Sequence, residues 1–505
     1  MRKNKLKICY SETCKILFFL SILLIGTIGC QRNPEKEKAK TLFRPNILWI
    51  VADDLGTDLG CYGDSLIYTP NLDQLANEGV KYNHFYPVTA VCSPSRSTMI
   101  TGMYPTSIDC HQHRTRYKKS LPDGIYPITK YFKDAGYFTS NGDFRNNNKA
   151  GKQDYNFKAD SIFDGTDWIQ RKPGQPFFSQ VQIHYPHRAF SRDSLHPVDQ
   201  NAVHLPPYYP DHRIARQDWA LYLETIQILD REVGKILARL DEEGLADNTV
   251  VFFFGDQGRC MMRAKQFMYD GGIHTPLIIR YPGEMHKGVD KDILVSNVDL
   301  APATLALAGI KIPDYMQGVD FLNPDVPERE YVFSMRDRRD ETVDRIRAIR
   351  TQNFKYIRNF YPDKPYTQFN AYKKQAYPVL TLMQMMHREG KLTPVQDQFM
   401  TDTKPAEELY DLTRDPWEIH SLAGDKNYSD TLQYFRALMD TVLLRYDKGN
   451  YPEDEKEIIY AKQLMENRYI NIMKKRGLSL QPSDEEILKY WKKQLTPTGG
   501  KEGVR

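Results

Sequence analysis

Two long apolar runs, each ending in a pair of oxygen-bearing side chains, constrain the fold of this chain more than any other feature. Residues 46–52 read NILWIVA and residues 249–255 read TVVFFFG, without the alternation of a strand that has one face in water. Continuous apolar runs of this length are typical of strands buried on both faces, in sheets that carry helices on both sides. The sequence therefore predicts a sheet in the middle of the protein.

Helical patterns lie between these runs. In residues 71–79 and 219–244, apolar residues recur at spacings of three and four. Strands that alternate with helices predict an α/β fold with a doubly wound, mostly parallel sheet. In such sheets, ligands bind beyond the carboxyl ends of the strands. The two runs end in Asp53-Asp54 and Asp256-Gln257, so both pairs are expected at that edge.

These four side chains offer three carboxylates and one amide oxygen. Hard oxygen ligands of this kind favour Ca²⁺ or Mg²⁺ over zinc. The alternative is that each pair caps the helix that follows its strand. Two such pairs at two strand ends favour a metal site over two caps.

The segment from Cys92 to Gly102 reads CSPSRSTMITG. It resembles the signature of the type I sulfatases, Cys-x-Pro-Ser-Arg followed by Thr-Gly, whereas a cysteine without this context is most often a small buried hydrophobic residue. In that family a sulfatase-maturating enzyme converts the cysteine to formylglycine. The hydrated aldehyde has two hydroxyl groups, so that one attacks sulfur and the other collapses to the carbonyl and expels sulfate, which a serine cannot do.

The resemblance implies an alkaline-phosphatase-like fold with one Ca²⁺, for which the implied ligands are Asp53, Asp54, Cys92, Asp256 and Gln257. Relatives usually carry Asn or His where this chain has Gln257, whose side chain is longer than that of Asn but keeps an oxygen ligand. Arg96 follows Cys92 by four residues, so both would share one face of a helix that begins at the motif. The resemblance implies that Arg96 stabilises the aldehyde hydrate. Ser95 is expected to cap the start of that helix, where partial positive charge suits a bound anion.

Further segments are similar to those that bind sulfate in the family. Lys152 is the expected sulfate-binding lysine, although the Gly-Lys-Trp-His of relatives is absent here, and Lys149 is the alternative. A solvated loop position is the other interpretation of either lysine. Lys265 matches the basic residue that relatives place on the sulfate and the bridging oxygen, and Arg259 and Arg263 are the neighbours that could be confused with it.

Residues 177–187 read FFSQVQIHYPH and look like the strand of the family that ends in a His-x-Pro-His turn. His184 is expected to bind the sulfate or to protonate the leaving oxygen, a task that suits a side chain with a pKa near neutrality. His187 is expected to lie nearby or to touch the sugar. Either ring could instead satisfy buried polar groups. His274 occupies a turn often held by Arg in relatives and is expected to face the substrate.

The texture of the sequence changes from residue 331 onward. Residues 345–358 read RIRAIRTQNFKYIR, and this alternation of basic and apolar residues predicts a half-exposed antiparallel sheet. We expect a catalytic domain over residues 44–330, a smaller C-terminal α+β subdomain with a small antiparallel sheet over residues 331–440, and a helical extension over residues 441–505.

The balance of 69 basic and 65 acidic side chains, a net charge of +4, argues against a nucleic-acid partner. Arginines could bind the carboxylates and sulfates of a polyanionic glycan, because a guanidinium pairs with such groups bidentately, although exposed arginines are also ordinary. The overall sequence pattern resembles the heparan N-sulfatase and bacterial polysaccharide-sulfatase branches of the family. The expected substrate is a sulfated, uronate-containing polysaccharide, either an algal glycan such as ulvan or a glycosaminoglycan. The candidate arginines are Arg114, Arg116, Arg336, Arg338 and Arg339.

The N-terminus has the pattern of an export signal. A basic start, MRKNKLK, precedes a largely apolar run over residues 16–28, which is short for a membrane span. Residues 27–30 read TIGC and resemble a bacterial lipobox, which implies a signal peptide over residues 1–30, lipidation of Cys30 and an outer-membrane anchor. Residues 31–43 are expected to form a polar tether, and the enzyme is expected in the periplasm or at the cell surface.

The sequence leaves four alternative functions open. An N-sulfoglucosamine sulfamidase and a formylglycine-dependent phosphonate monoester hydrolase would use the same motif. A two-metal phosphatase or phosphodiesterase of the alkaline-phosphatase-like superfamily would need a Thr or Ser nucleophile and more His and Asp metal ligands. A non-catalytic glycan-binding lipoprotein would not need the nucleophile, whereas Cys92, Pro94 and Arg96 are all present.

Overall fold

The predicted central sheet has eight strands, in the order β4-β3-β5-β1-β6-β7-β2-β8. The computed structural model describes residues 44–449, 451 and 453–496, so the predicted signal peptide, Cys30 and the tether lie outside the described residues. β3, β5, β1 and β6 are parallel, β2 and β8 are parallel, and β4 and β7 are antiparallel to their neighbours. The strands are β1 (Asn46–Ala52), β2 (Val80–Tyr86), β3 (Phe138–Asp143), β4 (Asn146–Ala150), β5 (Phe177–Ile183), β6 (Thr249–Gly255), β7 (Leu277–Arg280) and β8 (Val289–Ser296).

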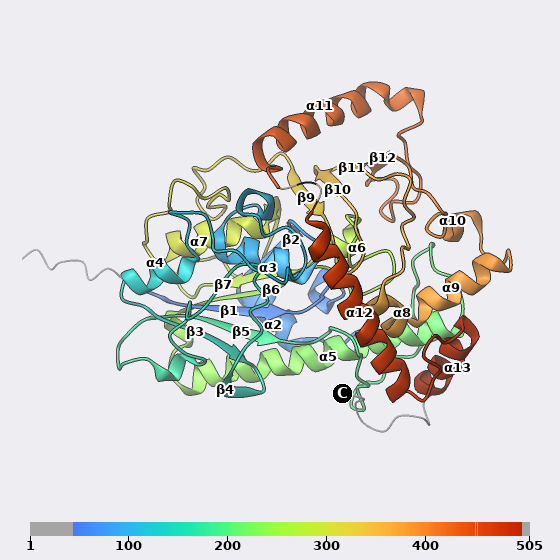
Figure 1. The fold of residues 1–505 in the computed structure, drawn as a ribbon. Helices are drawn as coiled ribbons and strands as arrows, with labels where there is room; N and C mark the ends of the chain where they lie inside the picture. Colours follow the sequence, from blue (N-terminus) through green and yellow to red (C-terminus); the bar gives the residue numbers. More distant parts are fainter. Residues whose placement is uncertain (1–43, 450, 452, 497–505) are drawn as a thin grey trace, which may run out of the picture. The chain divides into compact units, whose positions relative to one another are not determined.

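Helices cover both faces of this sheet (Figure 1). Leu48 and Ile50 of β1 pack into one hydrophobic cluster with α2 (Pro70–Glu78) and α5 (Arg213–Glu242). Ile47, Trp49 and Val51 pack into the other cluster, with α3 (Cys92–Thr101), α4 (Ile128–Asp134) and α7 (Leu300–Leu307). Successive side chains of a strand point to opposite faces, so a strand with helices on both sides must be apolar at every position. The doubly wound α/β fold is confirmed.

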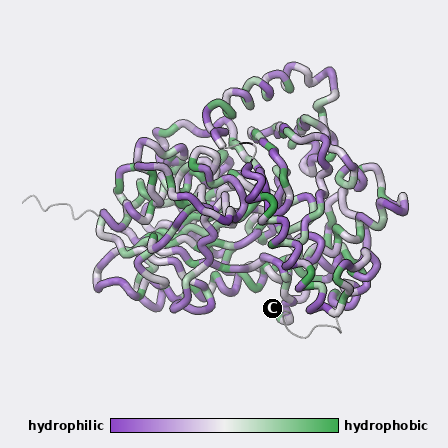
Figure 2. The backbone as a smooth tube through the Cα atoms, viewed as in Figure 1, coloured by the Kyte–Doolittle hydropathy of each residue, from purple (hydrophilic) through white to green (hydrophobic). Residues whose placement is uncertain are grey.

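A second, four-stranded antiparallel sheet has the order β12-β11-β10-β9. α11 (Ser429–Tyr446) packs against it through residues that recur along one helical face, including Phe435, Met439 and Val442. This helix, at the top of Figure 2, carries both hydrophilic and hydrophobic residues. The strands are β9 (Val332–Arg336), β10 (Ile346–Arg350), β11 (Phe354–Asn359) and β12 (Glu407–Asp411).

The prediction that this small sheet is half-exposed is wrong. Arg347 and Lys355 are fully buried. Arg347 is paired with Asp337 and with Asp447, which follows α11. A charged side chain is buried when an ion-pair partner accompanies it, and an alternation of charged and apolar residues does not reveal such partners.

The remaining α-helices lie mostly in the C-terminal third of the chain. α12 contacts α8, and α13 contacts both α9 and α5, so the last helices pack on earlier parts of the chain. α11 crosses residue 440, and the expected domain boundaries stay a prediction. These helices are α6 (Asp270–Ile273), α8 (Ala371–Ala376), α9 (Pro378–Arg388), α10 (Pro394–Asp397), α12 (Glu455–Lys475) and α13 (Asp484–Leu495), with short 3₁₀ helices at Gly60–Tyr62, Pro105–Ile108, Trp168–Gln170, Ala246–Asn248, Asn297–Asp299 and Lys426–Tyr428.

Within the described part of the chain, no helix is both long and apolar enough to cross a bilayer. The cysteines in the same part, Cys61, Cys92, Cys110 and Cys260, are all free thiols.

Candidate active site

The carboxyl ends of three neighbouring parallel strands, β5, β1 and β6, meet at one edge of the large sheet. β1 leads directly into Asp53 and Asp54, β6 into Asp256 and Gln257, and β5 into His184. The edge at which ligands bind in sheets of this kind therefore carries the predicted acidic pairs and a histidine.

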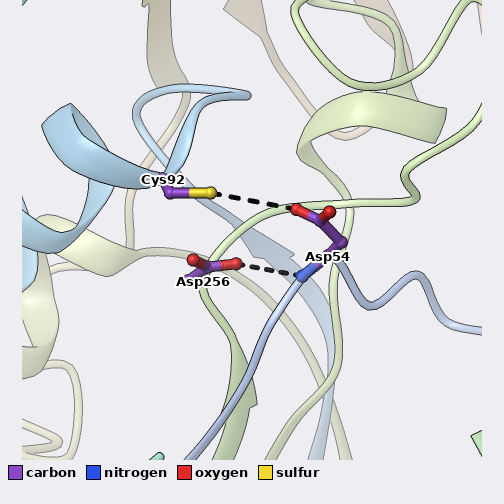
Figure 3. Close-up of side chains that lie close together, drawn as sticks. All are labelled: Asp54, Cys92 and Asp256. Carbon is purple, nitrogen blue, oxygen red and sulfur yellow. Dashed lines mark hydrogen bonds between the residues drawn. The ribbon is translucent and has the colours of Figure 1, made fainter. Parts of the chain in front are cut away.

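Cys92 lies against these carboxylates, as Figure 3 shows. Ligand atoms of Asp54, Cys92 and Asp256 all lie within 4.8 Å of one another. Cys92 Sγ is 4.0 Å from Asp54 Oδ1, and the Asp54 backbone N–H donates to Asp256 Oδ1 at 3.1 Å. The backbone of Asp54 is in the left-handed region, with a φ of 64°. This conformation is uncommon for residues other than glycine, and such residues are found most often at functional sites. Three segments thus bring side chains to the spacing of a single cation site.

Gln257 supplies an oxygen that fits such a cation. Its amide nitrogen donates to Asp54 Oδ1 and, at 3.2 Å, to Cys92 Sγ. Its Oε1 is buried and has no hydrogen-bond partner among the described residues. A buried acceptor without a donor is suited to a cation, and carboxylates with an amide oxygen are ligands that Ca²⁺ accepts.

The carboxyl groups of the cluster have pKa values that are shifted in opposite directions. Burial raises the pKa of Asp256 to about 6, and the nearby charges of Asp53 and Asp54 add to this rise although Arg96 opposes it. Burial is also the largest single influence on Asp54 and disfavours its ionised form, but the charge and hydrogen bond of Lys265, together with His187, lower the pKa of this carboxyl. Several carboxylates that share one buried site repel each other, and a divalent cation would relieve that repulsion.

Arg96 links the acidic strand ends from α3, whose ten residues are all buried. Its Nε donates to Asp256 Oδ2 at 2.9 Å, and its Nη2 donates to Asp53 Oδ1. Its Nη1 donates to Gln182 Oε1 at 2.7 Å. Arg96 and Cys92 therefore reach the same cluster from one helix, as the spacing of four predicts.

The prediction that Ser95 caps α3 is wrong. The helix begins at Cys92 with Val91 as its N-cap residue, and among the described residues no side chain caps it. Ser95 is the fourth helical residue, too far along to serve as the N-cap. Its Oγ instead donates to Asp256 O and accepts a hydrogen bond from Asn297 Nδ2 at 2.9 Å, which ties α3 to the end of β6.

Lys152 reaches the site and Lys149 does not. Lys152 Nζ donates to Asp53 Oδ2 at 3.0 Å, and Lys152 O accepts from Arg96 Nη1 at 3.2 Å. Lys149 is exposed on β4, and its closest recorded charge partner is Asp143, at 3.9 Å. Of the two candidate lysines, the structure brings only Lys152 to the cluster.

Both predicted histidines border the cluster. His184 Nδ1 is 3.3 Å from Asp53 Oδ2, and half of the His184 side chain is exposed. His187 Nε2 is 3.8 Å from Asp54 Oδ2, and the two imidazole rings are 4.7 Å apart. Burial lowers the pKa of His187 to about 3, so this ring is neutral near pH 7.

Lys265 is the basic residue of its loop that contacts the site. Its Nζ is 2.6 and 2.7 Å from the two carboxylate oxygens of Asp54 and 3.7 Å from Cys92 Sγ. Arg259 pairs with Asp58 instead, and Arg263 donates to backbone carbonyls of residues 417 and 418. The ambiguity among these three basic residues is therefore resolved by their contacts.

Arg114 lies beside the cluster without touching it. It pairs with Asp154 through two hydrogen bonds of 2.9 and 2.8 Å, and about half of its side chain is exposed. Asp154 follows Lys152 by two residues, which places this pair next to the site. His274 Nε2 lies 2.8 Å from Asn83 O, and no described contact joins His274 to the cluster. The substrate-binding roles of Arg114 and His274 stay predictions.

Three other arginines do not have the exposure that glycan binding would require. Arg338 is bidentate with Glu453, and Arg339 pairs with Asp340 at 2.6 Å. Arg336, Arg338 and Arg339 are each no more than 3 % exposed. Arg336 lies 3.8 Å from Asp344. The expected role of these three arginines on the glycan is wrong, because internal carboxylates pair with all of them and burial encloses them. Of the five candidate arginines, Arg114 and Arg116 are exposed.

Tyr372 of α8 is a site residue that the sequence did not reveal. Its hydroxyl is 3.4 Å from His187 Nε2, and Lys265 Nζ lies 5.6 Å from the centre of its ring. Tyr372 is more than 100 residues further along the chain than Lys265 and belongs to no motif, so only the tertiary structure could identify it.

Comparison with known proteins shows which family profiles the sequence matches. The sequence profile of the family described as sulfatase matches residues 45–310. A profile described as the C-terminal part of N-sulphoglucosamine sulphohydrolase matches residues 258–401.

Individual relatives cover most of the chain. An ulvan-active sulfatase of Formosa agariphila is 33 % identical, over 87 % of this chain and 83 % of the relative. Human N-sulphoglucosamine sulphohydrolase is 25 % identical, over 77 % of this chain and 88 % of the relative. A protein solved with its substrate D-glucosamine-2-N,6-O-disulfate superimposes with a TM-score of 0.59 at 19 % identity, over 82 % of this chain and all of that one, which shows a shared fold.

Proposed function

This chain belongs to the sulfatase family and is a sulfuric ester hydrolase, and we propose that it removes sulfate from a sulfated, uronate-containing polysaccharide. The substrate class is an algal glycan such as ulvan, or a glycosaminoglycan. The ulvan-active relative supports the first and the human relative supports the second. The observation that carries the proposal is the position of Cys92, whose Sγ lies between Asp54, Gln257 and Lys265.

We propose that a sulfatase-maturating enzyme converts Cys92 to formylglycine. One hydroxyl of the hydrated aldehyde would attack the sulfur of R–O–SO₃⁻, and the S–O bond to the sugar would break as the leaving oxygen takes a proton. The second hydroxyl would then lose its proton and re-form the carbonyl, and the bond between residue 92 and the sulfate would break. Water would rehydrate the aldehyde. The free thiol that the sequence encodes could not complete this cycle.

One Ca²⁺ would be held by Asp53, Asp54, Asp256, Gln257 and residue 92. When bound, the cation would neutralise sulfate oxygens and make the diol more acidic. The buried, unpartnered Oε1 of Gln257 and the raised pKa of Asp256 support this assignment.

The basic side chains around Cys92 would divide the remaining work. Arg96 would orient the diol and hold Asp53 and Asp256 in place. Lys152 and Lys265 would bind the sulfate from two sides. His184, the more exposed histidine, would bind the sulfate or protonate the leaving oxygen, and His187 would lie against the sugar.

The formylglycine proposal predicts a defined mass change at residue 92. Mass spectrometry of the peptide that contains Cys92, from enzyme made in a host with the maturase, should show the aldehyde in place of the thiol. Cys92→Ala should release no sulfate from any substrate while the melting temperature stays within a few degrees, because the side chain is small and is not ion-paired. An active preparation that carries only unmodified Cys92 would refute the scheme.

A sulfamidase is the second candidate, because the C-terminal profile over residues 258–401 is that of N-sulphoglucosamine sulphohydrolase. Matured enzyme should be given defined O-sulfated ulvan and glycosaminoglycan oligosaccharides, N-sulfated glucosamine and an aryl phosphonate. Release of sulfate from the N-sulfate alone would favour the sulfamidase. Turnover of the aryl phosphonate alone would favour a phosphonate monoester hydrolase.

We further propose a periplasmic or cell-surface location with a lipid anchor at Cys30. The support is the apolar run that ends in TIGC at residues 27–30. The chain should incorporate radiolabelled palmitate in a Gram-negative host, and Cys30→Ser should abolish the label. Equal labelling of both proteins would refute the anchor.

A further inference from the structure

Helix α8 lies in the C-terminal part of the chain, yet it reaches two residues of the candidate active site. Tyr372 contacts His187 and Lys265, and its neighbour Lys373 donates from Nζ to Lys265 O at 2.9 Å. The helix is itself fixed at its start, because the side chain of Asn370 accepts a hydrogen bond from the Lys373 backbone N–H.

Tyr372 has little freedom to turn away from the site. It is 8 % exposed, and the guanidinium of Arg339 lies 4.8 Å from the centre of its ring. The Lys265 ammonium lies 5.6 Å from the same centre. Cations at these distances are attracted to the electron-rich face of an aromatic ring. The ring of Tyr372 is therefore packed between groups that hold it, and its hydroxyl is directed at His187.

The hydrogen bonds of His187 define which of its nitrogens is available. His187 Nδ1 lies 2.5 Å from Arg188 O, and a backbone carbonyl only accepts, so Nδ1 carries the proton in the neutral ring. His187 Nε2 then has a free lone pair, and the Tyr372 hydroxyl is the donor to it at 3.4 Å. This contact sets the angle at which Nε2 faces the cluster, 3.8 Å from Asp54 Oδ2.

We propose that Tyr372 is a positioning residue of the sulfatase reaction, which orients His187 through its hydroxyl and Lys265 through its ring. The proposal rests on the proposed function, because it concerns the same site. Under the proposed function His187 lies against the sugar and Lys265 binds the sulfate, so Tyr372 contacts one sugar-facing and one sulfate-facing group. An imidazole that turned away could no longer hold the sugar in line with the nucleophile, whereas 4-nitrophenyl sulfate has no sugar for His187 to contact. The hydroxyl of Tyr372 should therefore matter most for saccharide substrates.

The chain offers a matched control in Tyr377, the residue after α8. Its ring lies 5.7 Å from that of Tyr372, and like Tyr372 it is buried. Its hydroxyl is buried without a hydrogen-bond partner among the described residues. Tyr377→Phe therefore removes a hydroxyl from the same neighbourhood without removing a described contact to the site.

The test compares wild-type, Tyr372→Phe and Tyr377→Phe enzymes, all matured and all at the same Ca²⁺ concentration. Each is assayed on 4-nitrophenyl sulfate and on the sulfated oligosaccharide that the wild type hydrolyses. For Tyr372→Phe, we expect kcat on the oligosaccharide to fall on the order of tenfold, the worth of one hydrogen bond, with KM and the nitrophenyl rate within about twofold. Tyr377→Phe should match the wild type on both substrates.

Equal losses on both substrates, no loss, or the same loss in Tyr377→Phe would overturn the proposal. A wild type that releases no sulfate would instead refute the proposed function, so the two failures are distinguishable. A crystal structure of Tyr372→Phe gives a readout that does not need turnover. The His187 ring should rotate away from Asp54, and an unmoved ring would overturn the proposal.

Discussion

At the scale of single residues, Arg96 holds the acidic strand ends together. It is almost fully buried and pairs with Asp53 and Asp256, two carboxylates from different strands. Burial of several like charges is costly unless a counter-charge is fixed among them. The arginine of the motif is thus structural as well as chemical, since without it the strand ends would repel each other.

Arg96→Met should destabilise the protein because it leaves two buried carboxylates without their guanidinium. We expect a loss of about 3–5 kcal/mol in the free energy of unfolding, measured by urea denaturation in a chelating buffer. Arg414→Met is the control, because Arg414 is 78 % exposed and its nearest carboxylate is 3.8 Å away. A loss below about 1 kcal/mol for Arg96→Met would contradict this account.

At the scale of elements, the basic residues of the small sheet face internal carboxylates. Arg345 and Arg347 reach Asp447 at 2.8 and 2.9 Å, so the chain just after α11 is bound to β10 through charges. Tyr451 also donates to Asp447 at 2.9 Å. These contacts explain why strands rich in arginine can be buried in this protein.

The pKa of Asp447 predicts how this pairing responds to pH. Burial disfavours the carboxylate, but Arg347 and Arg345 outweigh burial and lower the pKa to about 2, from 3.8. Because the pKa is lower in the folded state, the stabilisation is complete above about pH 4 and is lost as pH falls through about 2. Asp447→Asn should cost about 2 kcal/mol at pH 6 and about half as much near pH 3.

The measurement is urea denaturation of wild-type protein and Asp447→Asn at several pH values. Asp440→Asn is a suitable control, because Asp440 is 64 % exposed and its ion-pair partner among the described residues is Arg358. A difference between wild type and Asp447→Asn that stays constant from pH 6 to pH 3 would show that the charge of Asp447 is not responsible.

At the scale of the whole molecule, the candidate site is assembled from distant segments. Its residues come from the ends of β1, β5 and β6, the start of α3, the loops at Lys152 and Lys265, and α8. Asp53 and Asp54 are neighbours in the sequence, but Asp256 and Cys92 join them only in the folded chain. A cation that binds them therefore binds the folded state and not the unfolded one.

Calcium should raise the melting temperature of the protein. A ligand that binds only the folded state stabilises it by about 2.7 kcal/mol at one hundred times its Kd. Differential scanning fluorimetry with chelator and with increasing Ca²⁺ should show a saturable rise, which Asp54→Asn should weaken. Arg414→Met should keep the full rise. An unchanged melting temperature in the wild type would contradict the cation site, whatever the activity of the preparation.

Several features followed from the sequence because short-range chemistry determines them. The runs at residues 46–52 and 249–255 had to be buried strands, since apolar side chains at every position need cover on both faces. Asp53, Asp54, Asp256 and Gln257 had to lie at the ligand-binding edge, since they directly follow these strands. Cys92 and Arg96 had to share a helix face, because four residues are about one helical turn.

Other features depend on which distant segments meet, and no local pattern encodes that. Arg347 and Lys355 look solvent-exposed in the sequence but are buried beside carboxylates from other parts of the chain. Ser95 looks like a helix cap in the sequence, but its side chain bonds to Asp256, which follows β6. Lys149 and Lys152 look alike in the sequence, but Lys152 reaches the acidic cluster and Lys149 is exposed on β4. The sequence by itself determined the sheet, the motif helix and the acidic edge, through periodicity and direct succession along the chain. Only the tertiary structure decided which charges pair and that Tyr372 borders the site, because ion pairs and side-chain contacts form between segments that are close in space and far apart in sequence.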